Sequence, residues 1–378
     1  MVTGDSGNDP LRSMRPMKWP TRLRGRPRIA SLLAVGYCIL TWTAQARGDD
    51  PPKPDTHGEN AVAFAPSGEW LVTGGSDGNL RIRDGTTGAV LDTLAGHEAE
   101  VRAVAVSPDG RTIASASNDC SARLWDVERR TVRRVLQTPK PPRGQLRSCF
   151  LAVAFAPDGR TVATGDDGGA SRRLAARVYK GKYDNVITGD SGGTIRLWDV
   201  ETGELKESWV ADPNSVDQVL YSPDGSTIAS VGDDPAVKLW DARSHAIRRT
   251  LPQPKVPRLY MAYSPDGATL AVSQEFSTKL WDPRNGVEKD HLSVCPAYAY
   301  AFTPDGDYLA VAGMFASRLW SVKARADGED RWSVLYEIPD PCSCSALAVS
   351  PDGRWVAHCF SKFGTKNPNR SFKLIAIR

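Results

Sequence analysis

The sequence is poor in the features that define several large classes of protein. It has only five histidines, and its seven cysteines form neither a CxxC pair nor the spacing of a metal finger. It has few helical runs, and its 33 glycines and 27 prolines favour a turn-rich fold over a helix bundle. Its apolar segment from Ile29 to Leu40 is too short for a comfortable membrane span. These deficits indicate a turn-rich globular protein.

The chain also lacks a basic surplus outside its first residues. The whole sequence has a net charge of +4, but residues 1–46 hold seven of the 48 Lys and Arg and only two of the 44 Asp and Glu. The remainder therefore has 41 basic and 42 acidic residues, a net charge of −1. This balance gives no support to a nucleic-acid partner, and we predict none.

Residues 1–46 are predicted to be an export leader. A basic stretch precedes the segment Ile29 to Leu40, and Ala44-Gln45-Ala46 provides the small residues of a cleavage site. We expect cleavage near Ala46, export to the periplasm or outside the cell, and a Pro-rich linker over residues 47–57. The alternatives are an uncleaved anchor or a cytoplasmic protein. Export would permit disulfides, but the spacing selects no pairing among Cys120, Cys149, Cys295, Cys342, Cys344 and Cys359.

One turn motif recurs seven times after residue 57. The motif is a small residue followed by Pro-Asp-Gly, or Pro-Ser-Gly in its first copy, and its prolines are 39 to 66 residues apart. An alternating strand pattern precedes each turn and a second one follows it, as in "VRAVAVS" and "TIASAS". A third strand often ends in Leu-Trp, and a fourth follows, for instance over residues 89–94. Periods near 40 residues with four short strands predict a propeller array.

At these residues the chain resembles the WD40 family of β-propellers, and the resemblance covers residues 58–378. It implies an all-β fold with a single seven-bladed propeller of four-stranded antiparallel blades. Blade two has the Gly-His pair typical of the family, Gly96-His97. The resemblance implies a buried hydrogen-bonded set of His97, Ser115, Asp119 and Trp125. Most other blades lack the histidine, and blade one has Arg83 where the tryptophan is expected.

Blade three is about 24 residues longer than the others. The sequence "TGDDGG" at Thr164 is followed by "TGDSGG" at Thr188, and both resemble the end of a second strand. The spacing of 66 residues between the flanking prolines is 42 plus 24, too short for an extra blade. We predict a hairpin-like insertion over about residues 166–189, in the connection between the second and third strands.

Neither of two chemical interpretations of these turns is supported. Gly-Asp-Ser-Gly-Gly around Ser191 matches the nucleophile motif of chymotrypsin-like proteases, but none of the five histidines lies in the setting that this mechanism needs. The aspartates at 166–167, 190 and 233–234 lack the regular spacing of a calcium loop and suit tight turns. We predict no catalytic residue, no metal and no cofactor.

Basic residues offer the best candidate partner site. The pairs Arg129-Arg130, Arg133-Arg134 and Arg248-Arg249 fall in outer strands and turns, where either solvated charge or a site for an acidic partner fits. The insertion combines arginine with tyrosine, residue types that are enriched in interface hot spots. The candidate partner-binding residues are Arg172, Arg173, Tyr179, Lys180, Lys182 and Tyr183.

The last blade ends one strand short at Arg378. A strand from residues 47–60 is Pro-rich and poor for closure, whereas Cys38 to Thr43 would make a better strand but competes with the leader interpretation. We predict a non-enzymatic scaffold that binds proteins on its loop faces. The alternative is a propeller enzyme or ligand sensor at the channel mouth, which the near absence of His, Glu and Arg from the first strands disfavours.

Overall fold

The computed structural model describes ten segments of the chain, and every regular element in them is a β-strand. The segments are residues 58–138, 147–169, 192–253, 259–274, 277–293, 297–313, 316–322, 334–339, 344–360 and 372–377. No helix capable of crossing a membrane occurs within them. The chain divides into two units, residues 1–52 and 53–378. The predicted leader and the linker over residues 47–57 lie outside the described residues.

Blades one to four are four-stranded sheets whose strands follow the order of the chain. Blade one comprises β1 (Glu59–Phe64), β2 (Trp70–Gly75), β3 (Leu80–Asp84) and β4 (Val90–Leu94). Blade two comprises β5 (Val101–Val106), β6 (Thr112–Ser117), β7 (Ser121–Asp126) and β8 (Thr131–Gln137). Blade three comprises β9 (Phe150–Phe155), β10 (Thr161–Asp166), β11 (Thr194–Asp199) and β12 (Leu205–Val210). Blade four comprises β13 (Val216–Tyr221), β14 (Thr227–Gly232), β15 (Ala236–Asp241) and β16 (Ile247–Pro252).

Blades five and six are also four-stranded, whereas blade seven has three strands within the described residues. Blade five comprises β17 (Met261–Tyr263), β18 (Leu270–Ser273), β19 (Ser277–Asp282) and β20 (Val287–Ser293). Blade six comprises β21 (Ala297–Phe302), β22 (Tyr308–Gly313), β23 (Ala316–Ser321) and β24 (Val334–Pro339). Blade seven comprises β25 (Cys344–Val349), β26 (Trp355–Phe360) and β27 (Phe372–Ala376). Of the two proposed closing segments, residues 38–43 and residues 47–57 of the segment 47–60 lie outside the described residues, whereas Glu59 and Asn60 belong to β1 of blade one.

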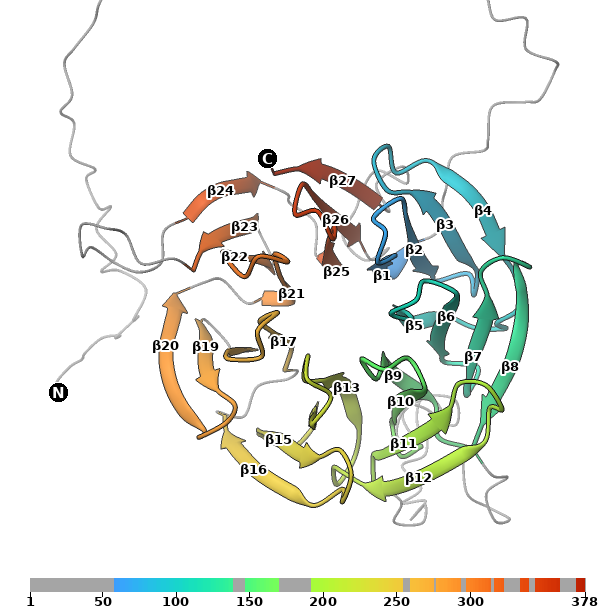
Figure 1. Cartoon of the computed structure of the whole chain (residues 1–378), viewed down its shortest axis with the longest axis horizontal. Helices are drawn as coiled ribbons and strands as arrows, with labels where there is room; N and C mark the ends of the chain where they lie inside the picture. Colours follow the sequence, from blue (N-terminus) through green and yellow to red (C-terminus); the bar gives the residue numbers. More distant parts are fainter. Residues whose placement is uncertain are drawn as a thin grey trace, which may run out of the picture. The chain divides into compact units, whose positions relative to one another are not determined.

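The seven sheets form a propeller, as the repeat predicts. They follow one another around a common centre, with the first strand of each blade innermost and, in blades one to six, the fourth strand outermost (Figure 1). The ring is closed, because β1 of the first blade contacts β25 and β26 of the last. In blade three the long connection runs from β10 to β11, between the second and third strands, and its residues 170–191 lie outside the described part.

The recurring Pro-Asp-Gly turns join neighbouring blades as well as neighbouring strands. The glycine of every copy has a φ between 65° and 74°, a conformation that side chains rarely adopt. At six seams, a Cβ placed on this glycine would lie 3.3–3.7 Å from the proline Cδ of the preceding turn. One of these contacts is between Gly68 of blade one and Pro351 of blade seven, at the closing seam. The motif therefore sets the distance between blades on one face, which we call the PDG-turn face.

Apolar side chains fill the six seams between consecutive blades from one to seven. Between blades one and two, for example, Val72 and Ile82 pack against Val101 and Trp125. The first position of the inner strand is apolar in this and other seams, as with Val101 and Val216. Burial of these side chains supplies the main stabilisation of the ring.

The closing seam between blades seven and one contains a buried ion pair instead. Glu59 occupies the strand position of Val101, and Arg83 occupies that of Trp125. Their side chains are bonded to each other, and Glu59 is fully buried. Arg83 also donates to Thr73 Oγ1 (3.3 Å) and to the carbonyl of Gly88 (3.1 Å). Burial raises the pKa of the Glu59 carboxyl, although the charge of Arg83 opposes this effect.

Two further contacts tie this pair to the last blade. The guanidinium carbon of Arg83 lies 4.6 Å from the ring centroid of Phe372 on β27, which is a cation–π contact. The hydroxyl of Ser345 on β25 donates to the backbone carbonyl of Glu59 at 2.7 Å. The departure from tryptophan at Arg83 is therefore compensated within the same seam.

The arrangement predicts strong coupling between positions 59 and 83. E59V or R83W alone leaves one buried charge without its partner, and we expect each to lower the free energy of unfolding by about 3–5 kcal/mol. The double variant E59V/R83W restores the pair of residue types found in blades two and four, so it should lose much less than the sum. Urea unfolding of the four proteins measures the coupling. Additive losses in the double variant would contradict this account of the seam.

Candidate interaction face around blade two

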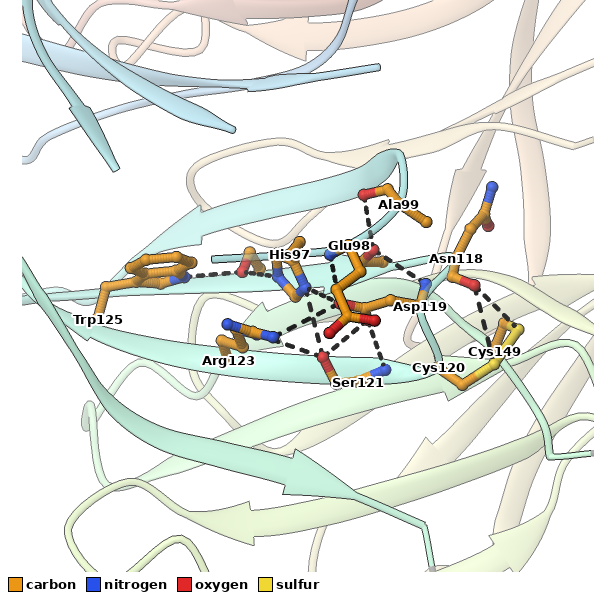
Figure 2. A network of polar contacts seen from close by, with 12 residues as sticks. His97, Glu98, Ala99, Asn118, Asp119, Cys120, Ser121, Arg123, Trp125 and Cys149 are labelled. Carbon is orange, nitrogen blue, oxygen red and sulfur yellow. Dashed lines mark hydrogen bonds and ion pairs between the residues drawn. A yellow bond between two sulfur atoms is a disulfide. The ribbon is translucent and has the colours of Figure 1, made fainter. Parts of the chain in front are cut away.

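The antiparallel order of each blade brings three connections to one end of the ring. These are the connection into the first strand, the turn between the second and third strands, and the end of the fourth strand. We call this end the interblade-loop face. In blade two it contains the polar network of His97 and Asp119 drawn in Figure 2.

The predicted set of four residues forms one chain of hydrogen bonds. The indole nitrogen of Trp125 donates to Ser115 Oγ at 2.8 Å, and this oxygen lies 2.7 Å from His97 Nε2. His97 Nδ1 lies 2.8 Å from Asp119 Oδ2. Since the carboxylate can only accept, Nδ1 carries the proton, and Nε2 accepts from the serine hydroxyl. The four polar side chains satisfy one another inside the blade, and three of them, His97, Asp119 and Trp125, are labelled in Figure 2.

Three further residues join this network and were not predicted from the sequence. Ser121 donates to Asp119 Oδ1 through both its hydroxyl (2.7 Å) and its backbone nitrogen (2.8 Å). The backbone nitrogen of Glu98 donates to Asp119 Oδ2 at 3.2 Å, and Arg123 lies 3.7 Å from the same oxygen. The sequence does contain a signal for the contact with Ser121, because in a turn an aspartate side chain commonly accepts a hydrogen bond from the backbone nitrogen two residues later.

Asp119 is held in its ionised form by these donors. Partial burial acts to raise the pKa of its carboxyl, but hydrogen bonds from His97 and Ser121 outweigh burial and keep the pKa well below its usual range. The network therefore contains a permanent negative charge at neutral pH.

Ser115, His97 and Asp119 have the order of contacts found in a serine-protease triad, but their setting is structural. Ser115 is fully buried, and its oxygen already accepts the indole N–H of Trp125. A triad needs its serine oxygen exposed beside donors for the developing oxyanion. No substrate carbonyl can reach this oxygen without opening the blade, so the arrangement fixes the strands.

In the other blades, the residue at the second-strand position of Ser115 determines whether the indole nitrogen of the tryptophan has a hydrogen-bond acceptor. Trp198 donates to Thr164 (2.9 Å) and Trp240 donates to Ser230 (2.8 Å), as Trp125 does to Ser115. In blades five and six the corresponding residue by strand register is Val272 or Val311. Within the described residues, the buried indole nitrogens of Trp281 and Trp320 have no hydrogen-bond partner.

A second polar cluster lies beside the network, where blades one and two meet. Asn60 on β1 donates to Glu100 at 2.8 Å, and Asn118 donates to the other oxygen of the same carboxylate at 3.1 Å. Arg102 lies 3.7 Å from Glu100. Glu100 is thus held by side chains from two blades and remains partly exposed, as a rigid acidic group on the interblade-loop face.

Cys120 and Cys149 form a disulfide between blades two and three. The bond lies next to the His97 network, near the carbonyl of Asn118 (Figure 2). Cys344 and Cys359 are buried in blade seven. The sequence left the pairing open, because six cysteines allow many combinations.

The candidate partner-binding residues of the insertion cannot be placed. Arg172, Arg173, Tyr179, Lys180, Lys182 and Tyr183 lie outside the described residues, as do Asp190 and Ser191. The ends of the long connection are described, and they are anchored. Asp166 pairs with the side chain of Arg196 and accepts from the backbone nitrogens of Gly168 and Thr194, each at 3.0 Å.

The aspartates considered as metal ligands have other partners. Asp167 accepts from the backbone of Cys149 and Gly169, each at 2.8 Å, and Asp234 pairs with Lys238 at 2.8 Å. Within the described segments, no group of three His, Cys, Asp or Glu side chains has an arrangement that could hold a metal ion.

The basic pairs of blade two lie on the opposite, PDG-turn face and reach toward neighbouring blades. Arg130 lies 3.7 Å from Asp92 of blade one, whereas Arg133 pairs with Glu201 of blade three. Arg134 donates to the carbonyl of Thr202 at 3.0 Å. These arginines therefore form contacts between blades, and only part of their charge is left to interact with solvent.

Comparison with known proteins finds three matches to one family. Residues 55–84, 88–126 and 203–241 match the family described as "WD domain, G-beta repeat", also called WD40. Nuclear distribution protein PAC1-2 of Uncinocarpus reesii is 32% identical over 193 residues, which cover 49% of this chain and 40% of the relative. Protein tipD of Dictyostelium discoideum is 29% identical, covering 48% of this chain and 25% of the relative. WD repeat-containing protein 1 of Xenopus tropicalis is 30% identical, with coverages of 38% and 27%.

These relatives correct the prediction of export. PAC1-2 and a second matching relative, PAC1 of Arthroderma otae, are named for nuclear distribution, a process inside the cell, which fits the cytoplasmic alternative and not a periplasmic or extracellular protein. A basic stretch before a short apolar segment is a pattern of low specificity, and here it misled. The chain spans less than half the length of these curated relatives.

The hydroxyl at the second-strand position predicts opposite effects in two blades. S115V should lower the free energy of unfolding by about 1–3 kcal/mol, because it leaves Trp125 and His97 without their shared partner. V272T offers an acceptor to Trp281 and should raise stability by about 1 kcal/mol. The matched control is V231T, which buries a hydroxyl in the apolar seam between blades four and five and should lower the free energy of unfolding. Denaturant midpoints that fall for both threonine variants would contradict the assignment.

The depressed pKa of Asp119 predicts a specific response to acid. The stabilisation by its carboxylate is fully present above the unfolded value near 3.9 and is lost as the pH falls through the lower folded value. The difference in unfolding free energy between the wild type and D119N should therefore shrink from about pH 5 to about pH 2. Urea titrations of both proteins at several pH values measure this difference in unfolding free energy. A difference that does not change with pH would show that the negative charge of Asp119 does not contribute to stability.

Proposed function

Because this chain belongs to the WD40-repeat β-propellers, we propose that it is a non-enzymatic scaffold that binds other proteins through its loop faces. Propeller relatives of this kind are typically interaction proteins. We propose further that its partners lie inside the cell, in agreement with the relatives named for nuclear distribution.

The observation that carries this proposal is the rigid attachment of the long blade-three connection. Both of its ends join strands that pair with each other, with Gly165 opposite Ile195. Asp166 is fully buried and binds backbone and side chain on both sides of the gap. A long segment between fixed strands can present binding residues while the scaffold loses little conformational entropy on binding.

The interblade-loop face provides the surface next to this connection. Glu100, held by Asn60 and Asn118, and the network of His97 and Asp119 keep its loops in place. The buried Ser115 argues against a catalytic role for the only Ser-His-Asp set found among the described residues. We therefore propose that Arg172, Arg173, Tyr179, Lys180, Lys182 and Tyr183 contact a protein partner beside this face.

Site-specific photo-crosslinking in cells tests this proposal. A photoreactive amino acid replaces Tyr179 or Tyr183 in the full chain, and a matched control replaces Val287, which is 57% exposed on the outer strand of blade five. We expect a discrete crosslinked protein at the tyrosine positions that is lost in R172E/R173E. Identical crosslinks at Val287, or crosslinks unaffected by the arginine substitutions, would overturn the assignment of these residues.

A further inference from the structure

The PDG-turn face contains two adjoining cavities at the junction of blades two and three. One has a volume of about 800 Å³ and is lined on blade two by residues 110–111 and by parts of the stretch 126–134. The other has a volume of about 560 Å³ and lies between the turns of blades two and three. Arg111 and Arg133 line both, so the two cavities form one groove across the seam. We call it the blade 2–3 groove.

Arginine dominates the charge of this groove. Its basic residues are Arg111, Arg129, Arg130, Arg133, Arg134, Arg160 and Lys206. Its acidic residues are Asp109, Asp126, Glu128, Asp199 and Glu201. The groove is therefore basic by two charges, whereas the chain after residue 46 has a net charge of −1. A local surplus of positive charge, on a molecule that is otherwise close to neutral, favours the binding of an anionic group.

Two of these arginines are available to a ligand. Arg111 and Arg160 occupy the same position, directly after the Pro-Asp-Gly turn, in neighbouring blades, and both are exposed. Within the described residues neither guanidinium makes a hydrogen bond or a salt bridge. The positive charge of Arg111 acts only at longer range, where it helps to lower the pKa of Asp109 in the same turn. Both side chains retain their donors, and a guanidinium can hold a carboxylate through two parallel hydrogen bonds.

Arg133 and Arg134 form a wall of the groove that is held by contacts with blade three. Arg133 pairs with Glu201, and Arg134 donates to the carbonyls of Thr202 (3.0 Å) and Arg133 (2.9 Å). The aliphatic part of Arg134 also packs against Gly203, where an added Cβ would lie 3.0–3.3 Å from it. Because these contacts already join blades two and three, the wall need not be ordered on binding.

The corresponding seam between blades four and five differs at the deciding positions. Its cavity of about 460 Å³ contains Arg248, Arg249 and Arg284. Arg248 is bonded to Asp241, and Arg249 donates to the carbonyl of Arg284. The residues after the two turns are Ser226 and Ala268 in place of arginine. The accessible pair of arginines is thus specific to the blade 2–3 groove.

We propose that the blade 2–3 groove binds an acidic peptide segment of a protein partner, with Arg111 and Arg160 as the principal contacts. The five carboxylates of the groove disfavour the continuous phosphate backbone of a nucleic acid. Separate carboxylate side chains can instead lie between them and reach the two free guanidinium groups. This second binding site lies on the face opposite the proposed loop site and does not depend on it.

Fluorescence anisotropy with defined probes tests this proposal. The full chain is titrated into a labelled short peptide in which glutamate alternates with glycine, and into the matching glutamine peptide. We expect saturable binding of the glutamate peptide only, weakening with added salt. R111E/R160E should raise the Kd about tenfold or more, because two charge-assisted contacts are lost. The control R243E changes an exposed arginine of blade four outside the groove and should bind as the wild type does.

Three results would overturn the proposal. They are binding unaffected by R111E/R160E, equal loss of binding in R243E, and tighter binding of a single-stranded oligonucleotide of matched charge. Both arginines are exposed, so the variants should keep the wild-type thermal unfolding midpoint, which is measured alongside. Absence of peptide binding would reject the groove and leave the loop site, which is tested by crosslinking, unaffected.

Discussion

A buried ion pair between Glu59 and Arg83 lies in the seam that closes the ring, whereas apolar side chains fill the other six seams. Removing two charges from water is costly, and this seam offsets the cost with several contacts. Thr73 and the carbonyl of Gly88 accept from Arg83, and Phe372 of the last blade covers its guanidinium. Blade one therefore differs from its neighbours in the residue types that meet blade seven. The loop faces are rigid only as long as this seam stays closed.

Within the blades, one hydroxyl has a comparable influence. Ser115 connects an indole, an imidazole and, through His97, a carboxylate on the loop face. Where valine replaces it, as at Val272, the buried indole of Trp281 has no partner among the described residues. Blades two and three, which form the blade 2–3 groove, both retain this hydroxyl, as Ser115 and Thr164. In blade three, however, the buried indole nitrogen of Trp209 on β12 has no partner among the described residues.

Much of the fold could be predicted because the signal is repeated. Seven turns and five Leu-Trp strands specify the blade, and the four-residue set around His97 follows from the resemblance. The partners of Arg83 could not be predicted, since nothing local indicates that Glu59, 24 residues away, would neutralise it. The pairing of Cys120 with Cys149 depends on how two blades pack, which spacing does not encode. The groove was missed because Arg111 and Arg160 are adjacent only in space, and location was misjudged from a short, unspecific pattern.

The contacts of the turn glycines with the preceding prolines, found at six seams, make the stacking sensitive to the number of blades. An eighth blade would change the angle between all neighbouring blades. A duplication that only lengthens a connection leaves the stacking of the blades undisturbed. The repeated words "TGDDGG" and "TGDSGG", with their 24-residue offset, have the size of such a partial copy. The stacked turns leave little room for added residues on the PDG-turn face. The interblade-loop face, where β10 connects to β11, can accept a longer segment.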